Sequence, residues 1–367
     1  MKNFLLAVST LVFLIISLII VASRWPQKND LNYLIYELVL KESVDSSGSF
    51  IKEETELDYN LSYGWNDYEN NNFSITFTIS KELLAEAEAE FGYYPDEFKR
   101  FLDETSNSMT REMIKFLKDY ASQEIEKSQY SQYIQIVDIS PDKFNLSLSA
   151  PPKLKSEIKA EFKSITEKIF KKRTSQLKKI SKQLKVKSQE YFEKRGIRTS
   201  GDAVEVDYDF CVQKNRLRLK PVFERMKKSR PELNIFQFLQ VVLSFTQEIK
   251  YTNLLLEENN KFILEFWVPP KVLVNNSGDC DSKAATFASI WTNLRSYPVV
   301  FIQIKRHILV GVAVPAAGEA DITIHGLRYT LCEVAGPAKI PPGLIHQYSR
   351  MHLRNRPLKY QLIKSRP

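Results

Sequence analysis

The chain has 367 residues, a length that accommodates two domains, and its 43% hydrophobic and 12% aromatic content excludes a disordered protein. The net charge of +8 is unevenly distributed: residues 153–198 hold 16 Lys and Arg against 5 Glu, a surplus of 11, so the rest of the chain sums to about −3. The three cysteines, Cys211, Cys280 and Cys332, exclude a disulfide framework. We expect all three to be free, with a Cys211–Cys332 pair as the alternative.

Residues 1–30 predict a membrane anchor. Residues 4–22 form a run of 19 apolar or small residues behind a single Lys2. That length spans a bilayer and exceeds the usual apolar core of a signal peptide. A cleaved signal peptide is the alternative, because Val21-Ala22-Ser23 is an acceptable cleavage context. We expect a single-pass inner-membrane protein whose bulk lies on the periplasmic or otherwise extracytoplasmic side.

Residues 31–150 predict a small α+β domain. Several segments alternate apolar and polar residues with period two, which is typical of half-buried strands. Between them are two segments with a helical pattern, interrupted near residues 92–95. The expected strands cover residues 57–63, 73–79 and 144–148, and the expected helices cover residues 81–90 and 96–127.

Residues 151–199 predict one long basic helix, because apolar residues recur there at three- and four-residue steps. Its charge surplus fits either a solvated helical face or attraction to anionic lipid headgroups or envelope polymers. We do not expect nucleic acid as a partner, because no recognition motif or interleaved aromatic set accompanies the charge.

Residues 200–367 predict a second α+β domain, with helices over 213–228 and 235–250 before a conspicuous turn. Gly278 suits a sharp turn, and Asp279 is a good N-cap for a helix over 283–294. This places Cys280 in the first helical turn, where free backbone N–H groups and the helix dipole favour the nucleophilic thiolate. The alternative is a cysteine that only fills space in the core.

Strand-like runs follow the cysteine, at residues 299–304, 307–314, 322–325 and 328–334. If the run that His307 begins pairs antiparallel with the run that ends at Val334, the start of one strand faces the end of the other. His307 and Glu333 then become neighbours on one face. Together with Cys280 they predict a cysteine–histidine–carboxylate site.

These segments resemble the bacterial transglutaminase-like superfamily, whose core is related to papain-like cysteine proteases. The resemblance rests on Gly278-Asp279-Cys280-Asp281-Ser282-Lys283-Ala284, on His307 at the head of a strand, and on residues 329–337, and it covers about residues 207–343. It departs from the family at Glu333, where many members carry Asp. The resemblance implies acyl transfer from a peptide amide through a thioester on Cys280, with a protein or peptide as substrate.

Other residues have weaker functional interpretations. Trp267 aligns with a position that often carries an oxyanion donor in related enzymes, so its indole N–H and the Cys280 N–H are candidate donors; a core tryptophan is the alternative. His325 is a competing candidate for the base. We expect no metal site, since no second histidine or cysteine lies at ligand spacing from Cys280, and no cofactor.

The sequence thus predicts an envelope protein with an N-terminal transmembrane helix, a smaller α+β domain, a long basic helix and a papain-like transglutaminase core. Two functions follow. One is a cysteine hydrolase or acyltransferase with Cys280, His307 and Glu333 as its site. The other is a catalytically inactive core of the same fold that serves as an envelope binding or scaffolding module.

Overall fold

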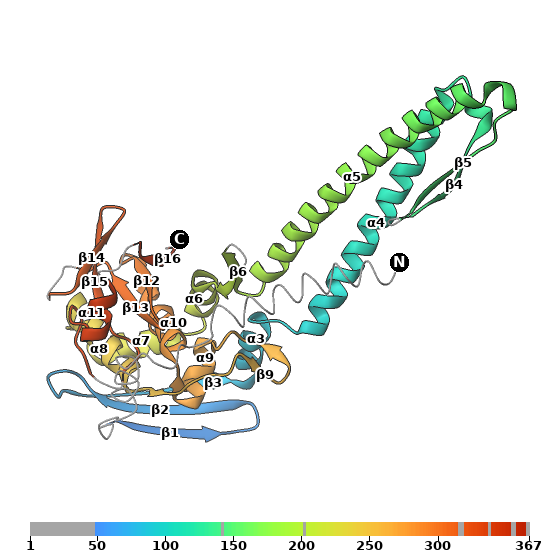
Figure 1. Ribbon diagram of the computed structural model, residues 1–367. Helices are drawn as coiled ribbons and strands as arrows, with labels where there is room; N and C mark the ends of the chain where they lie inside the picture. Colours follow the sequence, from blue (N-terminus) through green and yellow to red (C-terminus); the bar gives the residue numbers. More distant parts are fainter. Residues whose placement is uncertain are drawn as a thin grey trace. The chain divides into compact units, whose positions relative to one another are not determined.

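The computed structural model describes residues 48–140, 143–200, 203–314, 319–336, 339–353 and 357–364 (Figure 1). The predicted anchor at residues 4–22 lies outside this part of the chain. The fold is mixed α+β, as predicted, and its contacts divide it into two compact units. The first unit contains Tyr94–Phe192 and Thr199–Ala203; the second contains residues 48–93, Glu193–Arg198 and the chain from Val204 onward.

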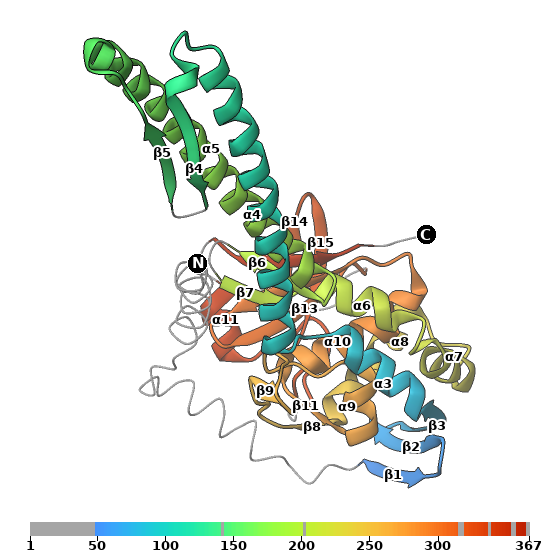
Figure 2. The same cartoon turned by 90° about the vertical axis from the view of Figure 1, so that its right-hand side faces the viewer.

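The first unit is built on two long helices, α4 (Pro95–Glu126) and α5 (Lys155–Glu193). Figures 1 and 2 show them side by side, with a β-hairpin along them. The hairpin strands are β4 (Ile134–Ile139) and β5 (Phe144–Leu148), and short 3-10 turns, η1 (Ser131–Tyr133) and η2 (Pro152–Leu154), flank it. Apolar residues at helical spacing form the shared core: Met113, Leu117, Ala121 and Ile125 from α4, Ile165 and Ile169 from α5, and Ile134 and Ile139 from the hairpin.

The second unit begins with an antiparallel meander of β1 (Ser49–Glu54), β2 (Asp58–Asn66) and β3 (Asn72–Ser80), followed by α3 (Lys81–Glu90). Every second residue of β2 and β3 is buried, as the alternating pattern predicts. Aromatic rings on this face contact Phe245, with centroids 5.1 Å away for Tyr63 and 5.0 Å for Trp65.

The predicted boundary at residue 150 therefore differs from the observed division. The meander belongs to the second unit, which also contains the candidate site, and buries its apolar face within that unit. Helix α4 and the β4–β5 hairpin instead pack on the basic helix. A one-faced sheet must be covered, and α8 (Ile235–Glu248) supplies Phe245 for that purpose.

A five-stranded antiparallel sheet and several helices complete the second unit. The strand order is β14 (Asp321–Ile324), β15 (Leu327–Cys332), β13 (His307–Val312), β12 (Val299–Ile304) and β16 (Lys359–Ile363). The other helices are α6 (Tyr208–Arg216), α7 (Lys220–Ser229), α9 (Pro269–Asn275), α10 (Cys280–Trp291), η3 (Thr292–Leu294) and α11 (Gln347–Leu353). The short strands are β6 (Ile197–Ser200), β7 (Ala203–Val206), β8 (Lys250–Tyr251), β9 (Glu257–Glu258), β10 (Lys261–Phe262) and β11 (Ser277–Gly278).

Two details of this unit bear on the site. The single helix predicted over 213–228 is divided into α6 and α7, because Pro221 fits the first turn of a helix but not its interior. Helix α10 is buried on all sides from Ser282 to Trp291 and contacts α6, α8, α9 and β13. The helix that begins with Cys280 is therefore the central element of the unit.

The hydroxyl of Tyr63 donates a buried hydrogen bond to the Leu273 carbonyl and so joins the meander to α9. Tyr63→Phe should lower the free energy of unfolding by about 1–3 kcal/mol, because the carbonyl loses its buried donor. Urea unfolding measures the change. Tyr59→Phe is the matched control on the same strand, and an equal effect of both substitutions would contradict the assigned role of the bond.

Candidate functional site

The turn before α10 places Cys280 as the first residue of the helix. The Asp279 carboxylate accepts the Ser282 N–H at 3.1 Å, which confirms the predicted N-cap. Strand β11 pairs in parallel with β8, so the turn is attached to the end of α8.

The residue of this turn with left-handed backbone angles is Asn276 (φ 46°) rather than Gly278. Gly278 is instead needed for space, since a Cβ there would lie 3.2 Å from a methyl carbon of Val272.

Cys280 is half-buried as a whole residue, and its sulfur lies against the start of β13. Burial raises its pKa well above the ordinary value, and the charges of Asp281 and Asp279 raise it further. Backbone N–H groups of Ile308 and Asp281 donate toward the sulfur and lower the pKa, but by less. The expectation that the helix start favours the thiolate is therefore wrong for the resting state. Desolvation and two adjacent carboxyl groups outweigh the helix terminus.

His307 and Glu333 form a buried pair. The His307 Nε2 lies 2.7 Å from Glu333 Oε2, and the two side chains are 1% and 5% exposed. Strands β13 and β15 are antiparallel, and their ladder pairs Val310 with Cys332. Continued beyond Cys332, this register places Glu333 opposite Leu309 and on the same face as His307. The prediction that His307 and Glu333 are neighbours is confirmed, although the two residues are diagonal and not directly opposite each other.

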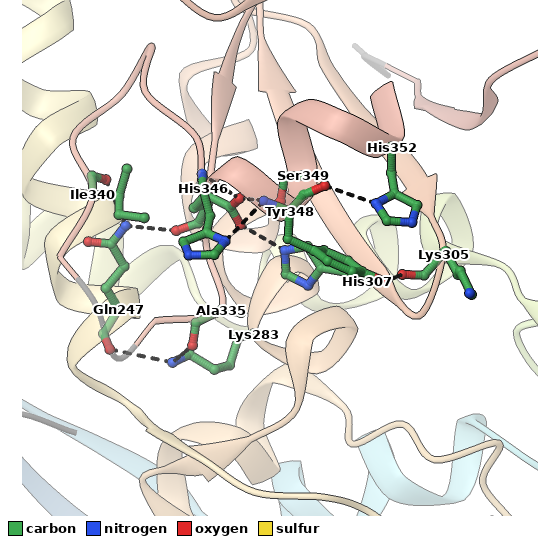
Figure 3. Close-up of polar contacts among 11 residues, drawn as sticks. Gln247, Lys283, Lys305, His307, Ala335, Ile340, His346, Tyr348, Ser349 and His352 are labelled. Atoms are coloured by element: carbon green, nitrogen blue, oxygen red, sulfur yellow. Dashed lines mark hydrogen bonds and ion pairs between the residues drawn. The ribbon is translucent and has the colours of Figure 1, made fainter. Parts of the chain in front are cut away.

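The second oxygen of Glu333 is also occupied. It accepts the His346 backbone N–H at 3.1 Å and the hydroxyl of the fully buried Ser349 (Figure 3). Burial acts to raise the pKa of Glu333, but the charge of His307 and these hydrogen bonds together hold it below the ordinary value. The ionised Glu333 accepts a hydrogen bond from His307 Nε2 and so fixes the orientation of the imidazole ring.

Lys283, one turn after Cys280, is fully buried. Its ammonium donates to the backbone carbonyls of Gln247, Ile249 and Ala335, which joins the end of α8 to the segment after Glu333 (Figure 3). Burial lowers its pKa to about 7, although the charges of Glu248 and Cys280 act to raise it. The sequence pattern does not predict this burial, since a single Lys in an apolar helix is more often exposed.

Gln247 supports the same segment. Its amide donates to the Glu333 carbonyl at 2.7 Å and to the Ile340 carbonyl at 2.8 Å, and its own oxygen accepts the Tyr68 hydroxyl at 2.8 Å. Gly336 packs directly on the Gln247 backbone, at φ 57°, where a Cβ would come within 2.5 Å of the Gln247 oxygen. The backbone that carries Glu333 is therefore held from both the Gln247 and the Lys283 side.

The other predicted residues have different surroundings. The Trp267 indole N–H donates to Glu258 at 3.2 Å, so an oxyanion role would require that bond to break, and the role stays a prediction. His325 occupies the two-residue turn between β14 and β15, at the end of β15 remote from Glu333, and its ring pairs with the Tyr360 hydroxyl at 3.1 Å. Cys211 and Cys332 are buried and free.

The chain matches no family model, no curated protein and no solved structure with which we compared it. Within the described residues, no group of three or more His, Cys, Asp or Glu is arranged to hold a metal ion. No helix of that part of the chain is both long and apolar enough to cross a membrane.

The depressed pKa of Lys283 predicts a pH-dependent stability. The unfolded chain holds this proton up to about pH 10.4, whereas the folded protein releases it near pH 7. The unfolded state binds more protons in that window, so the contribution of Lys283 to stability should rise with pH. In Lys283→Met, urea unfolding at pH 7 and pH 9.5 should show a smaller gain than the wild type. An unchanged gain would contradict the assignment.

Proposed function

We propose that the protein is a cysteine hydrolase or acyltransferase that acts on peptide amides through a Cys280 thioester, on a papain-like transglutaminase core. The single observation that carries this proposal is the buried pair of His307, the first residue of β13, and Glu333, the residue after β15, with the Cys280 thiol at the N–H of Ile308. The sequence resemblance described above supports the same chemistry. In this proposal residues 4–22 anchor the chain in the inner membrane, with its bulk outside the cytoplasm.

The chemistry follows from the protonation states. The thiol is neutral at rest, so His307 Nδ1 removes the thiol proton as the sulfur attacks the amide carbonyl. Glu333 stabilises the imidazolium that results and keeps Nε2 protonated. The imidazolium then gives its proton to the departing amine, which breaks the C–N bond and leaves the thioester. Water or a second amine attacks the thioester carbonyl while His307 removes its proton. The C–S bond then breaks, the acid or the new amide is released, and the imidazolium returns the proton to the sulfur, which restores the thiol.

Substrate binding fits this sequence of steps. Burial and the charges of Asp281 and Asp279 raise the pKa of Cys280, and a substrate that displaces water buries the thiol further, so the proton leaves to His307 only as the sulfur attacks. The N–H group of Cys280, at the first position of α10, is a candidate donor for the oxyanion that forms at the carbonyl oxygen.

The alternative is an inactive core that binds or scaffolds envelope components. One observation favours it: the resting thiol has a raised pKa, whereas many cysteine nucleophiles have a lowered one. A peptidyl acyloxymethyl ketone, which mimics an amide and traps an active cysteine, distinguishes the two functions. An enzyme is labelled at Cys280 near pH 7.5 and an inactive core is not.

Cys280 should be the most reactive thiol of the folded protein. It is half-buried, whereas Cys211 and Cys332 are 1% and 0% exposed with raised pKa values. Mild iodoacetamide treatment followed by peptide mapping should find Cys280 modified first, at a rate that grows with pH because thiolate accumulates. Faster modification of Cys211 or Cys332 would contradict the site.

Glu333→Gln should slow labelling by the acyloxymethyl ketone by about two to four orders of magnitude, by analogy with loss of the orienting acid in serine triads. The amide retains the size of the side chain but cannot stabilise an imidazolium. Cys280→Ala is the unlabelled control, and circular dichroism checks the fold. Wild-type rates in Glu333→Gln would show that the orienting group lies elsewhere.

A further inference from the structure

The basic charge of α5 is concentrated in one interval. Between Glu167 and Glu190 the sequence has nine Lys and Arg and no acidic residue. Some of these cations are engaged within the first unit: Lys168 pairs with Glu124 at 3.1 Å, Lys187 pairs with Glu190 at 2.8 Å, and Lys172 lies over the rings of Phe116 and Tyr120.

Five lysines of the interval are exposed and form no ion pair with any described residue. We call them the α5 lysine stripe; they are Lys171, Lys178, Lys179, Lys182 and Lys185. Four of them follow each other at steps of seven, four and three residues, which places them on one side of the helix. Ile165 and Ile169 point into the core of the unit, so the stripe occupies the outward side.

Repulsion between the lysines of the stripe destabilises the helix when no partner is bound. Like charges at three- and four-residue spacing repel each other on a helix, as Lys178, Lys182 and Lys185 do here. A partner with dispersed negative charge would relieve this repulsion. At a rise of 1.5 Å per residue the stripe is about 21 Å long, and it runs along a straight helix rather than around a pocket.

Exposed apolar side chains accompany the stripe. Val186 is 43% exposed and lies one turn after Lys182 on the same side of the helix, and Phe170, 57% exposed, lies at the edge of the stripe, about 100° around the helix from Lys171. Cationic and apolar groups together on one helix surface are typical of segments that lie on the headgroup region of a bilayer. A nucleic acid would gain little from this arrangement, because the stripe offers no set of aromatic rings on which bases stack.

We propose that the α5 lysine stripe binds the surface of an anionic lipid bilayer. Lysines near such a surface attract its headgroups, and the neighbouring apolar side chains enter the boundary between headgroups and acyl chains. The proposal concerns the first unit alone and does not depend on the chemistry of Cys280.

A vesicle competition tests the proposal on the full chain. The protein is offered an equal mixture of neutral phosphatidylcholine vesicles and vesicles with 30% phosphatidylglycerol, which are then separated by density. An apolar anchor enters both kinds alike, so the distribution ratio reports the charge-dependent part of binding. We expect the wild type to favour the anionic vesicles by at least a hundredfold at low salt, and the ratio to approach one at 1 M salt.

Lys171→Gln, Lys178→Gln, Lys182→Gln and Lys185→Gln combined should reduce this ratio by about fivefold per lysine until it approaches one. The matched control replaces Lys153, Lys155, Lys159 and Lys163 by Gln. It removes the same charge from the same part of the chain, but from a segment in which Glu157 and Glu161 are interleaved. The control should retain most of the preference, and Cys280→Ala should retain all of it.

Two results would overturn the proposal. One is an equal loss in the stripe variant and the control, which would mean that net charge alone drives binding. The other is loss of the vesicle preference when soluble polyphosphate is added at a charge concentration well below that of the lipid, which would identify a soluble polyanion as the better partner. Circular dichroism and thermal unfolding verify that both quadruple variants remain folded.

Discussion

The fully buried amino group of Lys283 is the constraint on which the candidate site depends. A polar group without water must find other dipoles, and here the carbonyls of Gln247, Ile249 and Ala335 provide them. These carbonyls belong to the end of α8 and to the segment after β15, whereas Lys283 itself belongs to α10. The hydrogen bonds of this one side chain thereby join the helix of Cys280 to the backbone that carries Glu333.

Burial acts to raise the pKa of both Glu333 and Cys280, but the neighbouring groups reverse this effect only at Glu333. Glu333 remains ionised because His307, Ser349 and the His346 N–H replace the water that it loses. Cys280 has two backbone donors, but it faces two carboxyl groups and stays a thiol. In the proposed function, Glu333 thus orients the base His307, and the nucleophile Cys280 starts as a thiol.

The sequence predicted what depends on local patterns. Helix α3, helix α4 and strand β5 follow from periodicity, and the His307–Glu333 contact follows from antiparallel pairing. It did not predict which unit holds the meander, because alternation identifies a buried face but not the residue that covers it, here Phe245. The burial of Lys283 and the raised pKa of Cys280 were also missed. Both depend on groups distant in sequence, such as Ala335 and Ile308.

The turn between β14 and β15 has a consequence at the opposite end of the second strand. His325 and Gly326 both have positive φ, at 50° and 79°, in a two-residue connection that pairs Ile324 with Leu327. Such a turn fixes the register of β15 against β14, so the two strands can move only together along β13. A shift of this hairpin by one position along β13 would exchange alternate faces and present the Cys332 thiol to His307 in place of the Glu333 carboxylate. The pairing of the whole hairpin with β13 thus decides which chemical group lies beside the imidazole.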